Sequence, residues 1–312
     1  MPRILTLGEI VVEIMAADVG QSLGAPGALL GPYPSGAPAI FIDQVARLGV
    51  PAALVACVGD DAFGRLNTER LARDGVDVSA VTVVPGATTG TAFVSYRADG
   101  GRDFIFHIAD SACARLGPQH LTAQALQGCT HLHVMGSSLF APGIVEAALR
   151  AVAEVKARGG SVSFDPNLRP ELLTHPGLRE ALRQVLAASD IVLPSGDELL
   201  HLVDAADEAQ AIERLQTLGV CEVVIKRGAG GASCITAAGR WDVAPLPVVE
   251  VDPTGAGDCF GGAYVAARQT GRTPAEALRL ANAAGALAVT RRGPMEGAAR
   301  LDELTALLEP TR

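Results

Sequence analysis

The stretch VDPTGAGDCFGG, residues 251–262, places a proline, a threonine and four glycines at one corner of the chain. Residues 248–251 before it are typical of a buried strand, and the apolar residues after it predict a helix that starts near Asp258. Each glycine inside a helix costs about 1 kcal/mol relative to alanine. Such a corner is explained if the backbone must approach another group closely.

The corner also has the composition of an anion-binding site. The backbone N–H groups of Gly255, Ala256 and Gly257 can point outward beside the positive end of the helix, an arrangement that binds phosphoryl groups. Asp258 would repel that anion unless it takes a proton from a hydroxyl group that attacks the phosphorus. The alternative is that Asp258 only caps the helix, as aspartate often does. The residues themselves leave both interpretations open.

Two common nucleotide-binding fingerprints are absent from the sequence. The pattern G-x-x-x-x-G-K-[ST] does not occur, and Phe260 takes the third glycine position of G-x-G-x-x-G after Gly255 and Gly257. The second fingerprint is also expected after a first strand, not near residue 255 of 312. A P-loop enzyme and a dehydrogenase are therefore disfavoured.

Outward from this corner, apolar runs alternate with helical patterns along the chain. The predicted strands are residues 3–8, 52–59, 131–136, 161–165, 190–194 and 222–226. The predicted helices between them are residues 142–160, 178–188 and 208–218. Runs that are apolar on both faces are typical of parallel strands covered on both sides. The alternation predicts an α/β fold, a three-layer αβα sandwich with a mainly parallel central sheet, as a single domain over residues 1–312.

Two segments break this alternation and predict a small β-sheet lid. Residues 9–36 are rich in glycine and proline, and residues 89–108 read as two strands joined by an ADGG turn. A flap of this kind beside the strand ends would exclude water from a reaction. The alternative is an edge hairpin that serves as a dimer contact, and the two roles are compatible.

The composition favours a cytoplasmic protein that binds small molecules. The net charge of −9 is spread without basic clusters, which disfavours nucleic-acid and membrane-surface partners. No apolar run approaches 18 residues, and the N-terminus has no leader pattern. Six cysteines without a C-x-x-C pair predict reduced core thiols, and His131 and His133 are interpreted as structural strand residues in preference to a metal pair.

DPTGAGD, followed by a glycine-rich helix, resembles the C-terminal signature D-T-x-G-A-G-D of the ribokinase-like (PfkB) carbohydrate kinases. Residues 34–64 resemble the N-terminal signature of that family, and FDPNLRPELL at 164–173 resembles its D-x-N-x-R segment. Residues 223–235 and 281–289 resemble its nucleotide-side motifs. The resemblance implies a ribokinase-like fold and an ATP-dependent kinase that uses Mg²⁺.

The resemblance also implies roles for the glycine corner. Asp258 would be the catalytic base that deprotonates a sugar hydroxyl attacking the γ-phosphate of ATP. Gly255, Ala256 and Gly257 would form the anion hole, in agreement with the reading of the backbone donors above.

Further residues match metal and nucleotide motifs of the family. Glu198 matches the glutamate of N-x-x-E, which supports Mg²⁺ through water, although Ser195 replaces the asparagine. Asp252 and Thr254 would take part in a monovalent-cation site, with K⁺ as the ion. The residues implied in nucleotide binding are Lys226, Gly228, Gly231 and Asn282. For Lys226 an ordinary strand-end lysine is the competing interpretation.

On the sugar side, the resemblance implies that Gly36, Ala37, Glu13 and Arg169 face the substrate. Two positions depart from the family pattern. Ser35 replaces the first glycine of a pair, and Ile40 stands where many members carry a sugar-binding asparagine.

The identity of the sugar depends on how a carboxylate would be held. Sugar-acid kinases of this branch place Tyr-Tyr-Arg before a Ser-Ala pair, but this chain reads FIFHIADSA, with Asp110 as a further substrate-binding candidate. The missing arginine favours a neutral ketohexose of the tagatose or fructose type. Arg97 or Arg102 could still supply the charge. The alternatives are a 2-keto-3-deoxygluconate kinase, a nucleoside kinase, or a non-catalytic sugar-binding regulatory protein.

Overall fold

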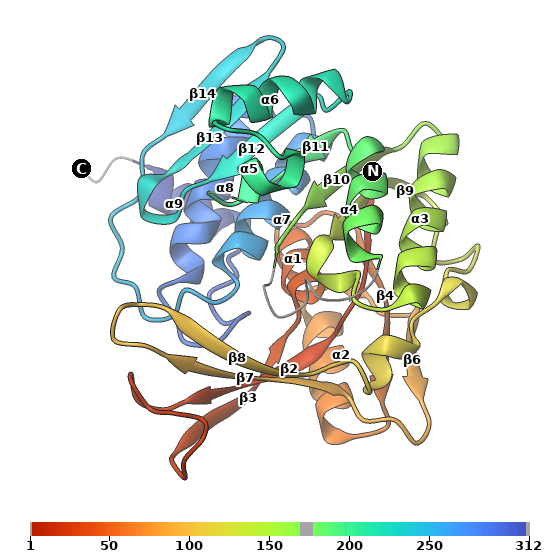
Figure 1. The fold of residues 1–312 in the computed structure, drawn as a ribbon, viewed down its shortest axis with the longest axis vertical. Coiled ribbons are helices and arrows are strands. Elements are labelled where there is room, and N and C mark those ends of the chain that lie inside the picture. Colours follow the sequence, from red (N-terminus) through yellow and green to blue (C-terminus); the bar gives the residue numbers. More distant parts are fainter. Residues whose placement is uncertain (1, 169–176, 197, 310–312) are drawn as a thin grey trace.

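A twisted, mainly parallel sheet forms the centre of a computed structural model that describes residues 2–168, 177–196 and 198–309 (Figure 1). Within these ranges the sheet has ten strands in the order β14-β13-β12-β11-β10-β9-β1-β4-β5, with β6 paired to β4. Its strands are β1 Arg3–Leu7, β4 Ala52–Gly59, β5 Val76–Asp77, β6 Val81–Val84, β9 Cys129–Met135, β10 Ser161–Asp165, β11 Ile191–Val192, β12 Glu222–Lys226, β13 Ala232–Thr236 and β14 Gly239–Val243. Only the β12–β13 and β13–β14 pairs are antiparallel among these strands.

Helices cover both faces of this sheet and bury its apolar side chains. One layer contains α3 Pro142–Ala157, α4 Leu178–Ala187, α5 Glu198–Val203 and α6 Glu208–Thr217. The other contains α1 Ala37–Arg47, α2 Ala62–Asp74, α7 Ala256–Gln269, α8 Pro274–Ala288 and α9 Leu301–Leu308. Short 3₁₀ helices lie at Ala112–Arg115, Pro118–His120, Gly136–Ser138 and Gly228–Gly230. The predicted αβα sandwich is therefore confirmed.

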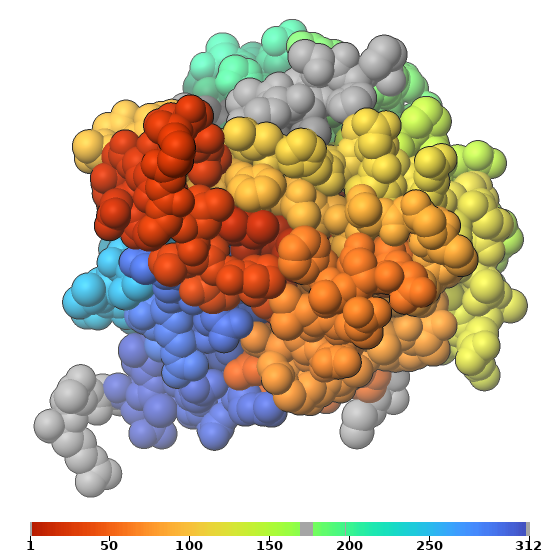
Figure 2. Space-filling model, turned by 90° about the horizontal axis from the view of Figure 1, so that it is seen from below, coloured from red at the N-terminus to blue at the C-terminus, as the bar shows by residue number. Residues whose placement is uncertain are grey.

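A second, four-stranded sheet lies against one end of the sandwich, at the bottom of Figure 1. It contains β3 Leu29–Ser35, β2 Val11–Ala16, β7 Gly90–Tyr96 and β8 Arg102–His107 in that order. These strands fall within the two segments expected to form the lid. In Figure 2 the red atoms of the N-terminal part adjoin blue atoms of the C-terminal part, and a Cβ atom on Gly293 would lie only 2.8 Å from the ring of Tyr33.

The glycine-rich corner, residues 248–262, differs from the sequence-based interpretations in two ways. Residues 248–251 form no strand, because Pro245 and Pro247 remove backbone donors from the segment leading into them. Helix α7 begins at Ala256, two residues before Asp258 and close to the expected start, and Gly255 is its N-cap. Asp258 therefore lies in the first turn of α7, and its interpretation as the cap is wrong.

The cysteines and the paired histidines have structural surroundings. All six thiols are free; five are buried, and only Cys221 is exposed, contrary to its expected place in the core. Burial raises the pKa of Cys57 to about 12 and lowers the pKa of His131 to about 3. His131 and His133 both hydrogen-bond to Ser163 at 2.7 Å, which fits the structural interpretation. No helix in the described part of the chain is long and apolar enough to cross a membrane.

Candidate active site

The carboxyl ends of the central strands, the start of α7 and the inner face of the lid enclose one cavity. The residues that line it are Glu9, Val11, Glu13, Ser35, Gly36, Ala37, Ile40, Ala92, Phe104, Phe106, Ile108, Ser137, Thr254, Gly255 and Asp258. The structure thus brings together Glu13, Gly36, Ala37, Thr254, Gly255 and Asp258, which the sequence analysis selected from three distant segments. A crevice at the carboxyl ends of parallel strands is the usual ligand site of an open α/β sheet.

The start of α7 is built tightly against the C-terminal loop. Gly255 has a φ of 80°, and a Cβ atom there would lie 2.3 Å from the carbonyl oxygen of Pro294, so that only glycine fits. The N–H groups of the first helical turn have no partner inside the helix and lie at its positive end. The N–H of Ala256 donates to the carbonyl of Pro253 over 3.4 Å, a long hydrogen bond.

Three carboxylates share the cavity. Asp258 is 7% exposed, and its Oδ1 accepts a hydrogen bond of 3.3 Å from the amide of Asn167. Glu13 accepts a hydrogen bond of 3.3 Å from Ser35, the residue that replaces a family glycine. Glu9 accepts a hydrogen bond from Ser138. The cavity is therefore rich in hydrogen-bond acceptors.

The lid supplies the apolar wall of the cavity. Phe104 and Phe106 alternate with exposed residues along β8, and their rings stack at 5.3 Å on the inner face. Sequence reasoning missed both rings, together with Glu9 and Ser137. The alternation in residues 102–107 was the available signal for the rings, and the position of Ser137 two residues after the end of β9 was the signal for that residue.

Two lid side chains also bind the loop that precedes α7. The hydroxyl of Tyr96 donates to Asp252 Oδ1 over 3.0 Å, and the guanidinium of Arg102 donates to the hydroxyl of Thr254 over 3.1 Å. Asp252 is 1% exposed, and among the described residues it makes no ion pair, only hydrogen bonds with neutral donors. A buried carboxylate of this kind has the chemistry to hold a cation.

A second group of charges lies between β10, β12 and α7. The ammonium of Lys226 is buried in an ion pair with Asp165, and a Cβ atom on Gly257 would lie only 3.6 Å from it. Glu198 accepts the backbone N–H groups of Leu168 and Ser195, each at 2.8 Å. Burial, and then the charge of Asp165, raise the pKa of Glu198.

The remaining nucleotide-side residues lie at the adjacent strand ends. Gly228 begins the short 3₁₀ turn after β12, and Gly231 follows that turn. Lys226 and Gly228 line a groove together with Ser195. Asn282 on α8 donates to the carbonyl of Ala244 over 2.8 Å.

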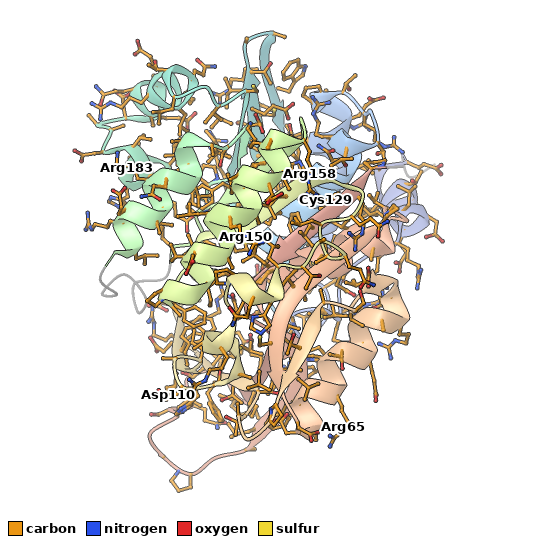
Figure 3. The ribbon with its side chains drawn as sticks, turned by 90° about the vertical axis from the view of Figure 1, so that its right-hand side faces the viewer. Arg65, Asp110, Cys129, Arg150, Arg158 and Arg183 are labelled. Carbon is orange, nitrogen blue, oxygen red and sulfur yellow. The ribbon has the colours of Figure 1, made fainter. Side chains whose placement is uncertain are left out.

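Some selected residues lie outside the cavity. Asp110 is exposed and does not line it, and Figure 3 shows this residue towards the end of the molecule that carries the lid. Arg97 is exposed and paired with Asp99 and Asp103. Arg169 lies outside the described residues. Of the two alternative arginines, only Arg102 contacts a cavity residue.

The sequence profile described as pfkB family carbohydrate kinase matches residues 1–300 of the chain. The chain belongs to this family. Among its curated relatives are probable fructokinase-4 of Arabidopsis thaliana, 33% identical over 98% of this chain and 96% of the relative, and 2-dehydro-3-deoxygluconokinase of Thermoproteus tenax, 33% identical over 99% and 95%. The protein is thus a carbohydrate kinase of the pfkB family.

Solved structures show the same fold over the whole chain. A putative ribokinase II from E. coli in complex with ATP and Mg²⁺ is 53% identical, with a TM-score of 0.94 over 99% of both chains. A fructokinase double mutant from Vibrio cholerae O395, bound to fructose, ADP and a potassium ion, is 30% identical, with a TM-score of 0.88 over 99% of both chains. The ribokinase-like fold of this pfkB kinase agrees with the sequence prediction.

Proposed function

We propose that this pfkB kinase transfers the γ-phosphate of ATP to a hydroxyl group of a neutral ketohexose of the fructose or tagatose type. The observation that carries the proposal is the cavity in which Glu9, Glu13 and Asp258 face the rings of Phe104 and Phe106. Carboxylates accept hydrogen bonds from sugar hydroxyls but repel a sugar acid. Fructokinases among the relatives, one of them bound to fructose, support this choice.

In the proposed reaction, Asp258 takes the proton of the attacking hydroxyl. Its low exposure and its place at the positive end of α7 support this role. Gly255, Ala256 and Gly257 would hold the phosphoryl group with the first turn of the helix. Gly36, Ala37 and Glu13, which line the cavity, would bind the sugar, and we extend the same proposal to Arg169.

The nucleotide and ions would bind on the α7 and β12 side of the site. Lys226, Gly228, Gly231 and Asn282 are proposed to bind ATP, supported by the groove beside Lys226 and Gly228. Glu198 would support Mg²⁺ through water, and this ion would neutralise charge on the phosphates. Asp252 and Thr254 would take part in holding K⁺, and the buried carboxylate of Asp252, which makes no ion pair with any described residue, supports that assignment.

A 2-keto-3-deoxygluconate kinase is the second candidate, because Arg102 reaches Thr254 on the cavity wall and one relative is a 2-dehydro-3-deoxygluconokinase. ADP release should be compared for fructose, tagatose, 2-keto-3-deoxygluconate, ribose and adenosine. We expect kcat/KM for a ketohexose to exceed that for the sugar acid by at least about tenfold, because the acid would place an anion among three carboxylates.

The variant Arg102→Ala separates the two candidates. With a neutral ketohexose as the substrate, the variant should keep the order of preference among the five acceptors. Turnover of the sugar acid alone, abolished by Arg102→Ala, would overturn the proposal in favour of the second candidate. A nucleoside kinase would instead turn over adenosine, and a non-catalytic protein would release no ADP with any acceptor.

The outer face of the lid is proposed to bind a second copy of the chain. Leu29 and Ile105 are each 47% exposed there, and β3 and β8 are edge strands with unpaired backbone groups. Ile105→Asp should convert a dimer into a monomer, measured by light scattering after size-exclusion chromatography. Asp103→Asn changes a neighbouring exposed residue on the same face and serves as the control. A wild-type protein that is monomeric at micromolar concentration would contradict the proposal.

A cytoplasmic location is also proposed, because it suits the use of ATP and the presence of free thiols.

A further inference from the structure

The turn after β10 places Asn167 directly beside Asp258. The side-chain amide of Asn167 donates to Asp258 Oδ1 over 3.3 Å, and the backbone of Asn167 has a φ of 40°. This left-handed conformation is uncommon for residues other than glycine, although asparagine tolerates it best. The chain therefore adopts a costly conformation at a residue whose side chain hydrogen-bonds to the proposed base.

Two carboxylates, the buried Asp165 and the half-buried Glu198, hold this turn by its backbone N–H groups. Asp165 Oδ1 accepts the backbone N–H of Asn167 at 3.2 Å. Glu198 Oε1 accepts the next N–H, that of Leu168, at 2.8 Å, while its other oxygen binds Ser195 in the neighbouring loop. The backbone on both sides of the Asn167 side chain is thus fixed by hydrogen bonds.

The anchor of this turn is itself rigid. Asp165 is fully buried and forms an ion pair with Lys226 of β12. The carbonyl of Pro166 lies against Gly136, where a Cβ atom would come within 2.1 Å of that oxygen. Strands β9, β10 and β12 together therefore determine where the amide of Asn167 points.

We propose that Asn167 is a positioning residue for phosphoryl transfer, whose amide fixes the rotation of the Asp258 carboxylate towards the attacking hydroxyl. The inference rests on the proposed role of Asp258 as the base. A neutral amide suits this task, because it orients the carboxylate without pairing its charge, as lysine or arginine would. A base held in a productive geometry before the reaction pays no reorganisation during it.

The test compares Asn167→Gly with wild type, because glycine adopts the left-handed backbone without steric cost and lacks the side chain that carries the amide. With ATP and fructose, or the acceptor that the screen selects, kcat should fall about ten- to a hundredfold, as expected for losing a hydrogen bond to a charged group. The KM values for both substrates and the thermal unfolding midpoint should stay close to those of wild type. Asn167→Asp, which keeps the length of the side chain but replaces the donor with a second carboxylate, should lose at least as much.

A double-mutant cycle with Asp258→Asn shows whether Asn167 acts through Asp258. Adding Asn167→Gly to Asp258→Asn should lower the residual turnover by less than about twofold. A full, additive loss in the double variant, or a wild-type kcat in Asn167→Gly alone, would overturn the inference and leave the base assignment intact. An Asp258→Asn protein with undiminished turnover would overturn the base assignment, and the inference with it.

Discussion

Replacing Asp258 with asparagine should lower kcat by about 10³-fold or more, because the amide keeps the shape of the side chain and cannot take the proton of the attacking hydroxyl. The substitution leaves the backbone donors of α7 in place. Calorimetric titration with ATP should therefore give an affinity close to that of wild type, and circular dichroism should give an unchanged melting curve. ADP release measured with the preferred sugar is the decisive quantity.

The control for this experiment is the same measurement without sugar, which reports any hydrolysis of ATP by water. A variant that keeps turnover while binding ATP normally would show that another group receives the proton. A variant that loses ATP binding together with turnover would show that Asp258 holds the nucleotide side of the site, against its proposed role.

Gly262→Ala should destabilise the protein by about 1–3 kcal/mol, the usual cost of overfilling a packed interior. A Cβ atom on Gly262 would lie 2.5 Å from the carbonyl oxygen of Phe41 and 3.0 Å from the Cβ of Gln44, both on α1. The backbone of α1 or α7 would have to move to make room. Urea unfolding followed by circular dichroism measures this loss.

Gly261→Ala is the matched control, one residue away in the same helix. A Cβ atom there would meet the ring of Phe41 at 3.5 Å, an ordinary contact. Because alanine favours a helix over glycine, this variant should gain up to about 1 kcal/mol. Equal losses in the two variants would contradict the proposed packing between α1 and α7.

This pair of glycines shows where sequence reasoning reached its limit. The cost of glycine in a helix correctly indicated that another group lies close to the backbone at these positions. The sequence pattern did not identify that group. Gly255 does lie on the cavity, whereas Gly262 meets another helix. The sequence around 261–262 contains no trace of Phe41, which is more than two hundred positions away and becomes a neighbour only after folding.

The fold was more predictable than the site, because strands leave a local pattern in the sequence whereas the site depends on contacts between distant segments. Strands such as Ala52–Gly59 are buried on both faces and therefore appear in the sequence as continuous apolar runs. Three of the residues 248–251 are valines, but the prolines before them prevented regular pairing. Asp258 could be selected because its motif is contiguous. Asn167 could not be assigned a role, because its function depends on a conformation and on contacts from three other segments.

The contacts between the lid and the loop before α7 bear on the hydrolysis of ATP by water. Tyr96 and Arg102 bind Asp252 and Thr254, and Gly255, the cap of α7, follows directly in the chain. In the proposed function, closing the lid over the sugar would therefore also order the turn that meets the phosphate. If the lid lifted away, the entry to α7 would lose both hydrogen bonds, and a water molecule arriving in place of the sugar would meet an unfinished site. Through these two hydrogen bonds, Tyr96 and Arg102 would limit the hydrolysis of ATP by water when no sugar is bound.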